Sequence, residues 1–294
     1  MKNNSVKGTI AALLTNVIFG FSFLFSKVAL DYSHPLIILS VRFTVAFAVL
    51  NLMWLCKILK LDFKGKPKTR LLFMAIAQPL LYYVFELYGI SNTSSAISGV
   101  IISLVPVAVL VLSSVFLHER PTRSQILFSA LSLAAIVTIS ILSNDGAAST
   151  LTGILLLLGA VICAAVFNIV SRSESKSFSP FERTYIMFLV GALGFNVIAL
   201  CTLGNGYFTE LSSACQSLEF WGSIAYLSLL SSIAAFALYN YSTTYISAVR
   251  SASFSNLITV VSVLAGIFIL GENLSVPQLI CCALIVLGVL GVNK

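Results

Sequence analysis

Two ionisable side chains, Arg42 and Glu86, lie inside long apolar stretches of the sequence. A charged group at the centre of a membrane helix costs about 2.5–3.5 kcal/mol on insertion scales, so such a residue is by default a candidate for function. Arg42 lies early in one stretch and Glu86 near the end of the next. At about 1.5 Å per residue, both are roughly 7–10 Å from the same membrane boundary. They can form an ion pair, or Arg42 can extend to the interface, and in either case Arg42 would be structural.

Gln78, Tyr82 and Glu86 occur at every fourth position, which places them on one face of a helix. Pro79 loosens the hydrogen-bond ladder of the same helix. A polar stripe on an otherwise apolar membrane helix must face the interior of the bundle or a wet cavity. Amide and phenol groups suit a zwitterionic or polar organic ligand, so the sequence predicts a small-molecule site lined by this helix.

Similar polar or aromatic positions occur in other apolar stretches. Each such amide or phenol can contact a ligand, or it can form a hydrogen bond that joins two membrane helices. The sequence leaves both roles open. The candidate binding residues are Asn16, Phe19, Phe23, Gln78, Tyr82, Glu86, Asn168, Tyr239, Asn240 and Asn256, and the candidate coupling or gating residues are Glu86 and Arg42.

The elements that carry these residues are predicted to be membrane helices. Of the 294 residues, 59% are hydrophobic and 9% are charged, and the mean hydropathy is +1.02, whereas a soluble domain has about 25% charged residues. A spanning helix takes about 20 apolar residues. The sequence therefore predicts an all-α membrane protein with ten transmembrane helices and a longer loop near 204–219. The spans lie near 8–30, 36–56, 70–90, 95–117, 124–142, 151–171, 182–203, 220–243, 248–270 and 276–292.

The distribution of basic residues predicts the orientation of these spans. The formal net charge of +7 would suit a nucleic-acid partner in a soluble protein, but in a chain this apolar it indicates topology. With the N-terminus in the cytoplasm, all of the 17 Lys and Arg residues except Lys27 and Arg42 fall on the cytoplasmic side or in its loops. We therefore expect a multi-pass protein of the bacterial inner membrane, with both termini cytoplasmic and Arg183 on the cytoplasmic side at the start of the seventh span.

The two halves of the chain resemble each other. One register aligns Gly8 with Gly153, Lys27 with Arg172 and Pro35 with Pro180, and a second aligns Tyr88 with Tyr241, Glu119 with Glu272 and Gln125 with Gln278. Because each half has five spans, an odd number, the sixth helix crosses in the direction opposite to the first. The sequence thus predicts two inverted five-helix repeats, residues 1–147 and 148–294. Inverted repeats recur in secondary transporters, because the halves can exchange conformations and open to either side alternately.

Several motifs resemble the drug/metabolite transporter superfamily, specifically transporters with two EamA domains. They are Asn16-x-x-Phe19-Gly20, Pro35 followed by Arg42-Phe43, the segment from Tyr88 to Pro106, and the endings Leu117-His118-Glu119 and Leu270-Gly271-Glu272. The resemblance covers essentially the whole chain. It implies ten helices in inverted halves around a central cavity, and export of amino acids or other metabolites. The chain departs from the family at Thr259, where a proline is common, and at Met187, which aligns with Arg42.

The expected function is secondary transport of a small polar metabolite, an amino acid or a related compound, by alternating access through a central cavity. Export is favoured by the resemblance alone. Uptake, or a channel for nucleoside-like or other small solutes, stays open as the alternative. Two roles for Glu86 stay open from the sequence: exchanging a proton that couples transport to the gradient, or pairing with Arg42, which opposes coupling. We expect a monomer in the lipid bilayer, with no nucleic acid, cofactor or metal.

An enzyme is disfavoured, because the sequence has no H-E-x-x-H or G-x-S-x-G motif. The histidines, His34 and His118, are predicted in loops at opposite membrane faces. Thr122 and Gln125 match a capping box that begins the fifth helix, as do Ser275 and Gln278 for the tenth, so these polar residues are expected to satisfy backbone groups.

Overall fold

The computed structural model describes residues 2–90, 92–93, 101–142, 150–270 and 276–293, and within these ranges the side chains of 2, 3, 23, 27, 90, 140, 262, 263 and 266–270 are not described. All regular structure in these ranges is helical. In chain order the helices are α1 (Lys2–Leu30), α2 (Pro35–Leu55), α3 (Thr69–Ala75), η1 (Ile76–Leu81), α4 (Tyr82–Ile90), α6 (Val105–Phe116), α7 (Arg123–Leu142), α8 (Leu151–Glu174), α9 (Pro180–Leu203), α10 (Gly206–Ala214), α11 (Leu218–Ala225), η2 (Tyr226–Ala234), α12 (Ala235–Tyr245), α13 (Ala248–Ser253), α14 (Asn256–Leu270) and α15 (Val276–Asn293).

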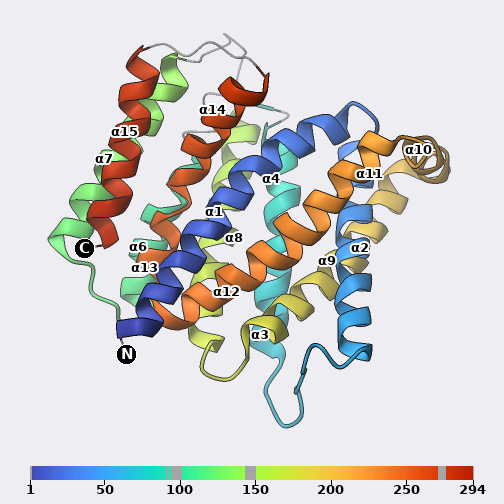
Figure 1. The fold of residues 1–294 in the computed structure, drawn as a ribbon, viewed down its shortest axis with the longest axis horizontal. Helices are drawn as coiled ribbons and strands as arrows, with labels where there is room; N and C mark the ends of the chain where they lie inside the picture. The colour runs from blue at the N-terminus through green and yellow to red at the C-terminus, as the bar shows by residue number, and fades with distance from the viewer. Residues whose placement is uncertain (1, 91, 94–100, 143–149, 271–275, 294) are drawn as a thin grey trace.

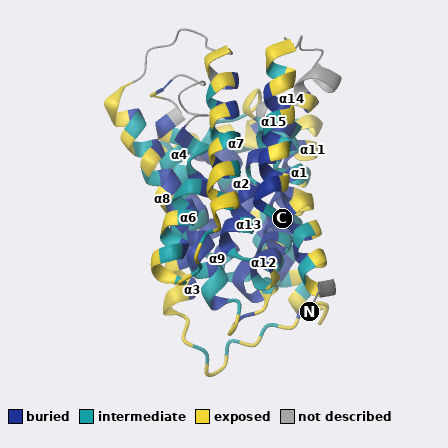
Figure 2. Cartoon of the chain, turned by 90° about the vertical axis from the view of Figure 1, so that its left-hand side faces the viewer, coloured by how far each residue is buried: buried dark blue, intermediate teal, exposed yellow. Residues whose placement is uncertain are grey.

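Seven helical runs in the described part are long and apolar enough to cross a membrane: Asn4–Leu30, Pro35–Leu55, Thr69–Gly89, Leu151–Glu174, Pro180–Leu203, Leu218–Tyr245 and Val276–Asn293. Shorter apolar helices cover Val105–Phe116 and Arg123–Ile139. The chain is therefore a multi-pass membrane protein. Figure 2 agrees, because the faces turned outward are exposed along the length of the helices while the buried residues lie inside the bundle.

The predicted spans differ from these helices in three places. The fourth span, predicted at 95–117, is represented by α6 from Val105, and residues 94–100 lie outside the described part. The ninth, predicted as one helix over 248–270, is divided into α13 and α14. The predicted loop near 204–219 contains the helix α10, which begins at Gly206, two residues after Gly204, whose φ is 53°. A positive φ is accessible to glycine without steric cost, so the chain turns sharply there between α9 and α10.

Side-chain caps explain where several helices begin. Ser179 and Glu182 form a capping box that begins α9, with Pro180 in the first turn, where its missing N–H costs nothing. The predicted box at α7 is confirmed, because Gln125 N–H donates to Thr122 Oγ1 at 3.2 Å and Thr122 N–H donates to Gln125 Oε1 at 3.0 Å. Ser275 lies outside the described residues, so the matching box at α15 stays a prediction.

The helices pack mainly across the two halves of the sequence. In Figure 1, α1 runs through the bundle beside α12 and α14, α2 lies against α9, α4 and α6 lie against α8, and α7 pairs with α15 at one side. Each of these contacts joins a helix before residue 143 to one after residue 150. The bundle is therefore held together by contacts between the halves.

The helices of the two halves are interrupted at corresponding places, by a kink at Gln78 in η1 and by the π-helical segment η2. The register that aligns Glu119 with Glu272 also brings η1 onto the last part of η2. In a π-helix the backbone hydrogen bonds span five residues, and such segments occur often at functional sites. Two interruptions in corresponding positions fit a two-repeat membrane fold.

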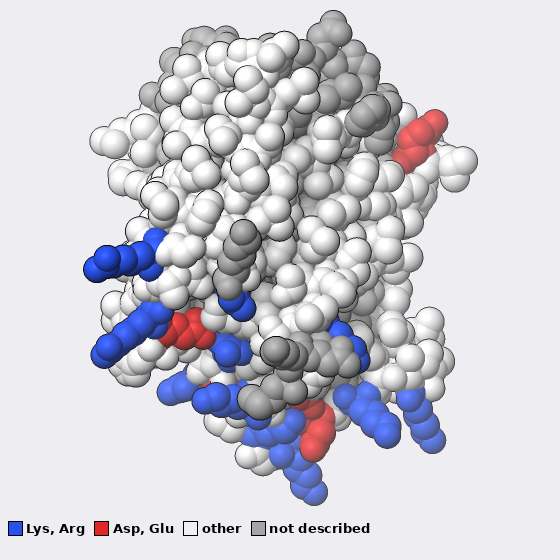
Figure 3. Space-filling view, turned by 60° about the vertical axis from the view of Figure 1, so that its left-hand side comes forward, with Lys and Arg blue, Asp and Glu red and all other residues white. Residues whose placement is uncertain are grey.

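The basic residues gather at one end of the bundle. This end, here called the basic end, holds the start of α1 and the connections α2–α3, α6–α7, α8–α9 and α12–α13 in the lower part of Figure 1. Among the described side chains, every Lys and Arg except Arg42 belongs to it, and Figure 3 shows them gathered in the lower part of one face.

The contact between α7 and α15 yields a first prediction. A Cβ added at Gly288 would lie 2.8 Å from the backbone oxygen of Phe128 and would overlap Ser132 Oγ. Because backbone must shift to relieve this, Gly288→Val should lower the free energy of unfolding by about 1–3 kcal/mol. Denaturation in SDS measures this change in the free energy of unfolding. The control is Leu287→Val at a position 54% exposed, and an equal loss in both variants contradicts the close packing.

Candidate functional site

Arg42 on α2 is buried, with 5% of its surface exposed. Its Nε donates to Ser232 Oγ at 2.8 Å and its Nη2 donates to Ser231 Oγ at 3.1 Å. Both serines belong to η2, and a third serine of η2, Ser228, donates to the backbone oxygen of Arg42 at 3.0 Å. The π-helical segment thus presents a cluster of hydroxyls to this guanidinium, which holds η2 against α2.

The Arg42 guanidinium also lies over aromatic rings. Its Cζ is 5.5 Å from the ring centre of Tyr83 and 5.6 Å from that of Phe43. A cation over a ring face is stabilised by the electrons of the ring, by about 0.5–2 kcal/mol. These partners are neutral, so they solvate the cation without cancelling its charge.

Glu86 on α4 accepts a hydrogen bond from the Tyr82 hydroxyl at 2.8 Å. The possible ion pair with Arg42 is not formed, because the ion pairs among the described residues are Lys66–Glu182, Arg70–Glu174 and Arg172–Glu119. The rings of Tyr82 and Tyr83 meet edge to face with centres 5.3 Å apart. The two tyrosines thus connect the carboxyl group to the guanidinium through one helix, α4, and leave the two charges available to other partners.

The polar stripe predicted on the third span is interrupted. Gln78 has φ −144° and ψ 123°, an extended conformation inside η1. Tyr82 and Glu86 keep the helical four-residue spacing and are hydrogen-bonded to each other, but Gln78 does not share a continuous helix with them. The predicted loosening at Pro79 is confirmed, since η1 contains this residue.

An aromatic layer lies next to the Arg42 group. The Phe43 ring is 4.9 Å from Phe195 and 5.2 Å from Phe188 on α9, and Phe188 is 5.8 Å from Phe236 on α12. Phe19 on α1 meets Phe236 edge to face at 5.3 Å. Phe19 is partly buried against this aromatic core, and its predicted contact with a ligand stays a prediction; the side chain of Phe23 falls outside the described residues.

A second buried polar cluster lies between α8, α9 and α12. Tyr239 donates to Asn168 Oδ1, and Asn240 Nδ2 donates to Thr184 Oγ1 at 3.0 Å. Asn240 also accepts from Ser171 Oγ at 2.8 Å. Three predicted site residues, Asn168, Tyr239 and Asn240, are thus brought together, but each is engaged in contacts between helices.

Arg183, predicted on the cytoplasmic side at the start of the seventh span, lies in the first turns of α9 and belongs to this second cluster. It is fully buried, and its Nη1 donates to the backbone oxygen of Ser171 at 2.6 Å and to Thr243 Oγ1 at 3.1 Å. Its Nη2 donates to Thr244 Oγ1 at 2.6 Å and to the backbone oxygen of Asn240. The capping box at Ser179 was the available signal, because it begins a helix before Arg183 and so turns the side chain into the bundle.

The remaining predicted residues lie apart from both clusters. Asn16 is buried on α1 and donates to the backbone oxygen of Ala12 at 2.7 Å, within its own helix. Asn256 is buried at the start of α14. The described residues contain no group of three His, Cys, Asp or Glu side chains that could hold a metal ion.

Comparison with known proteins places this geometry among transporters. The model of the EamA-like transporter family matches residues 6–141 and again 151–294. The chain is 34% identical to the "Uncharacterized transporter YcxC" of Bacillus subtilis, over 100% of this chain and 95% of that protein. It is 24% identical to a "Probable terminal-alkyne amino-acid exporter" of Streptantibioticus cattleyicolor, over 72% of this chain and 69% of that protein. A crystal structure aligns with a TM-score of 0.80 at 17% identity, over 97% and 95% of the two chains, and shows the fold.

The Arg183 cluster generates a second prediction. Arg183→Met leaves at least four buried acceptors without their charged donor, and a hydrogen bond to a charged group contributes about 1.5–3 kcal/mol. The variant should lose about 3 kcal/mol or more of unfolding free energy, seen as a lower midpoint of thermal unfolding in detergent. Arg123→Met is the control, because Arg123 is exposed at the start of α7. A similar midpoint for both variants contradicts a structural role for Arg183.

Proposed function

Because the chain belongs to the EamA-like transporter family, we propose that it is a secondary transporter that carries a small polar metabolite across the membrane by alternating access. The observation that carries this proposal is a pair of ionisable groups inside the bundle, the buried Arg42 and the partly buried Glu86, which bond to hydroxyls instead of to each other. Charges inside a membrane bundle mark substrate or ion pathways.

The proposed architecture has ten crossings in two inverted five-helix repeats, with the basic end and both termini in the cytoplasm. Seven crossings have full-length helices. The other three are α6 with the segment before it, α7, and the divided helix α13–α14, which has the position of a ninth crossing. Support for the orientation comes from the basic residues, which in bacterial membrane proteins are enriched in cytoplasmic loops.

The proposed substrate is an amino acid or a related compound. A guanidinium binds a carboxylate through charge-assisted hydrogen bonds, so Arg42 would bind the substrate carboxylate, while Glu86 with Tyr82 would receive the ammonium group. Tyr83 and the neighbouring rings would contact its apolar part. The name of one distant relative, an amino-acid exporter, supports this class and the direction of export. Glu86 is also the proposed site of a proton that couples transport to the gradient.

Counterflow in proteoliposomes tests the transport activity. Vesicles loaded with an unlabelled amino acid should accumulate the labelled one transiently, because a carrier that returns with substrate is stimulated from the trans side. A pool of labelled amino acids serves as the first substrate panel, and hits are identified beforehand by their stabilising effect in thermal unfolding. Flux without trans-stimulation would identify a channel, and no flux with any member of the panel would exclude this substrate class.

Glu86→Gln generates the third prediction. The amide keeps the size of the side chain but can neither carry a charge nor release a proton, so counterflow should fall at least about tenfold, the effect of losing one charge-assisted contact. The residual flux should no longer respond to an imposed pH gradient. Glu210→Gln on α10 is the control, because Glu210 is exposed at the end opposite the basic end. Unchanged flux and an unchanged response in Glu86→Gln contradict the role of Glu86.

A further inference from the structure

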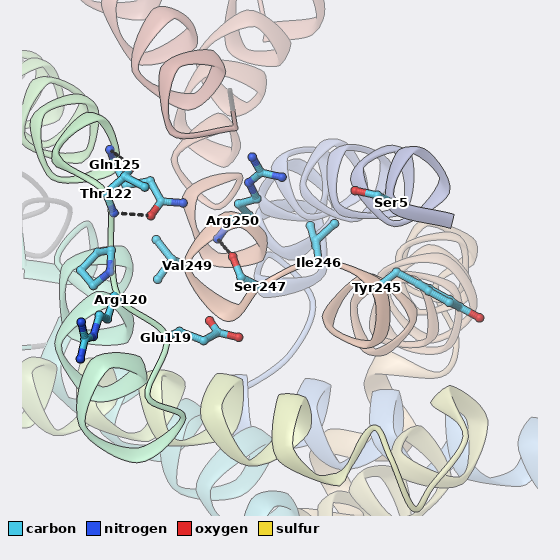
Figure 4. Close-up of a pocket in the computed structure, with 11 residues that line it drawn as sticks. Ser5, Glu119, Arg120, Thr122, Gln125, Tyr245, Ile246, Ser247, Val249 and Arg250 are labelled. Atoms are coloured by element: carbon cyan, nitrogen blue, oxygen red, sulfur yellow. Dashed lines mark hydrogen bonds between the residues drawn. The ribbon is translucent and has the colours of Figure 1, made fainter. Parts of the chain in front are cut away.

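A pocket of about 340 Å³ opens at the basic end (Figure 4). Its walls come from the start of α1, the α6–α7 connection and the α12–α13 turn, and they include Ser5, Glu119, Gln125, Tyr245, Ser247 and Arg250. The pocket is polar and lies between the two segments that match the family model. It is not used by the Arg42 group or by the Arg183 cluster.

Glu119 connects this pocket to the interior of the bundle. One carboxylate oxygen accepts from Arg172 Nε at 3.3 Å and the other accepts from the backbone N–H of Ala248 at 3.2 Å. Arg172 in turn donates from Nη1 to the backbone oxygens of Thr243 at 2.8 Å and Thr244 at 2.9 Å. One ion pair therefore ties together the ends of α6, α8, α12 and α13.

A series of buried polar side chains continues inward from this ion pair. Thr243 and Ser171 are hydrogen-bonded at 3.0 Å, and Ser171 donates to Asn240. Next along α8 and α12 are Asn168 and Tyr239, and the ring of Tyr239 lies 5.5 Å from Phe167 in the aromatic core. Polar groups thus extend from the floor of the pocket to the aromatic layer beside the proposed substrate site.

The other two ion pairs at this end are built differently. Glu182 is 4% exposed, binds Lys66 Nζ at 3.1 Å, accepts from the backbone N–H of Asp62 and also caps α9. Glu174 pairs with Arg70 at a longer 3.7 Å, and Arg70 is 76% exposed. The Glu119 and Arg172 side chains are 22% and 29% exposed. Water therefore reaches both partners of the Glu119–Arg172 pair, whereas Glu182 and Glu174 are nearly enclosed.

We propose that this pocket is the mouth of the transport path at the basic end and that the Glu119–Arg172 pair is its gate. The inference rests on the proposed transport function, and the mouth would admit the same small polar substrate. In the closed state, the Glu119–Arg172 pair holds the turn between α12 and α13 against α6. Opening requires Glu119 to leave Arg172 and the Ala248 N–H, which frees the turn and exposes the polar series behind it.

A thiol placed in the pocket tests the mouth. In vesicles with the basic end facing the bath, a bulky membrane-impermeant maleimide should reduce counterflow at least about fivefold in Ser5→Cys. The wild type is the matched control, because its exposed Cys56 lies at the same end outside the pocket. Complete labelling of Ser5→Cys with unchanged flux would overturn the proposal that this pocket is the mouth of the transport path. If the unlabelled proteins carry no flux, the proposed function fails, and the gate is still tested by the next experiment.

A reporter thiol behind the ion pair tests the gate without any transport assay. The thiol introduced by Ser171→Cys should react with a small impermeant reagent about fivefold faster when Glu119→Gln is added, the effect of losing a partly exposed ion pair. Adding Arg120→Gln to the reporter is the control, since it changes the neighbouring charge in the same loop without touching the pair. Peptide mass spectrometry measures the rates at this position.

Equal rates with Glu119→Gln and Arg120→Gln would overturn the gate. A structural effect would raise labelling at every buried cysteine, so Cys281 and Cys282 on α15 serve as internal references and should not change. Arg172→Gln removes the other partner and must give the same acceleration. If Glu119→Gln is not monodisperse, this second variant decides the result.

Discussion

The structure depends on one constraint, namely that lipid offers no hydrogen-bond partner to a polar group inside the bundle. Every buried donor and acceptor must therefore be satisfied by the chain itself. Serine, threonine and asparagine side chains on α8, α9, η2 and α12 meet this need through contacts that cross between helices. The same contacts fix the positions of the helices, because hydrophobic burial gives little preference for one helix neighbour over another when the solvent is itself apolar.

The two buried arginines meet most of this need in different ways, and among the described residues Arg183 Nε is one of three buried side-chain atoms without a hydrogen-bond partner. Arg183 is bound mostly by backbone oxygens and hydroxyls of α8 and α12, which are held in place by their own helices. Arg42 is bound by serine hydroxyls of the π-helical η2 and by ring faces. A hydroxyl can turn to another partner, whereas a helix carbonyl cannot. Releasing the Arg42 guanidinium therefore needs only rotation of serine hydroxyls, while Ser228 still donates to the Arg42 backbone oxygen and keeps η2 on α2.

The sequence predicts the parts of this fold that follow from apolar length and local capping. Long apolar runs predicted α1, α2, α8 and α9, and the Thr122–Gln125 box predicted the start of α7. The sequence does not predict features that depend on tertiary contacts. The division of the ninth span, the helix α10 and the burial of Arg183 depend on neighbours distant in sequence, and a basic residue at a predicted helix end is normally a loop residue.

The candidate site shows the same division. The residue types were predictable, because charge and amides inside apolar runs are costly, but the pairing was not. Depth alone allowed an ion pair between Arg42 and Glu86, yet depth does not state which helices lie side by side. The bundle places η2 against α2, so serines of η2 bind Arg42. Glu86 is bound instead by Tyr82, which lies on the same helix as Glu86, α4. Corresponding helices of the halves, α2 and α9, each bury one arginine, Arg42 and Arg183. Near Arg183 the buried carboxylates Glu182 and Glu174 pair with Lys66 and Arg70. Glu86 forms no ion pair among the described residues, which is why the proposed coupling chemistry belongs to the first half.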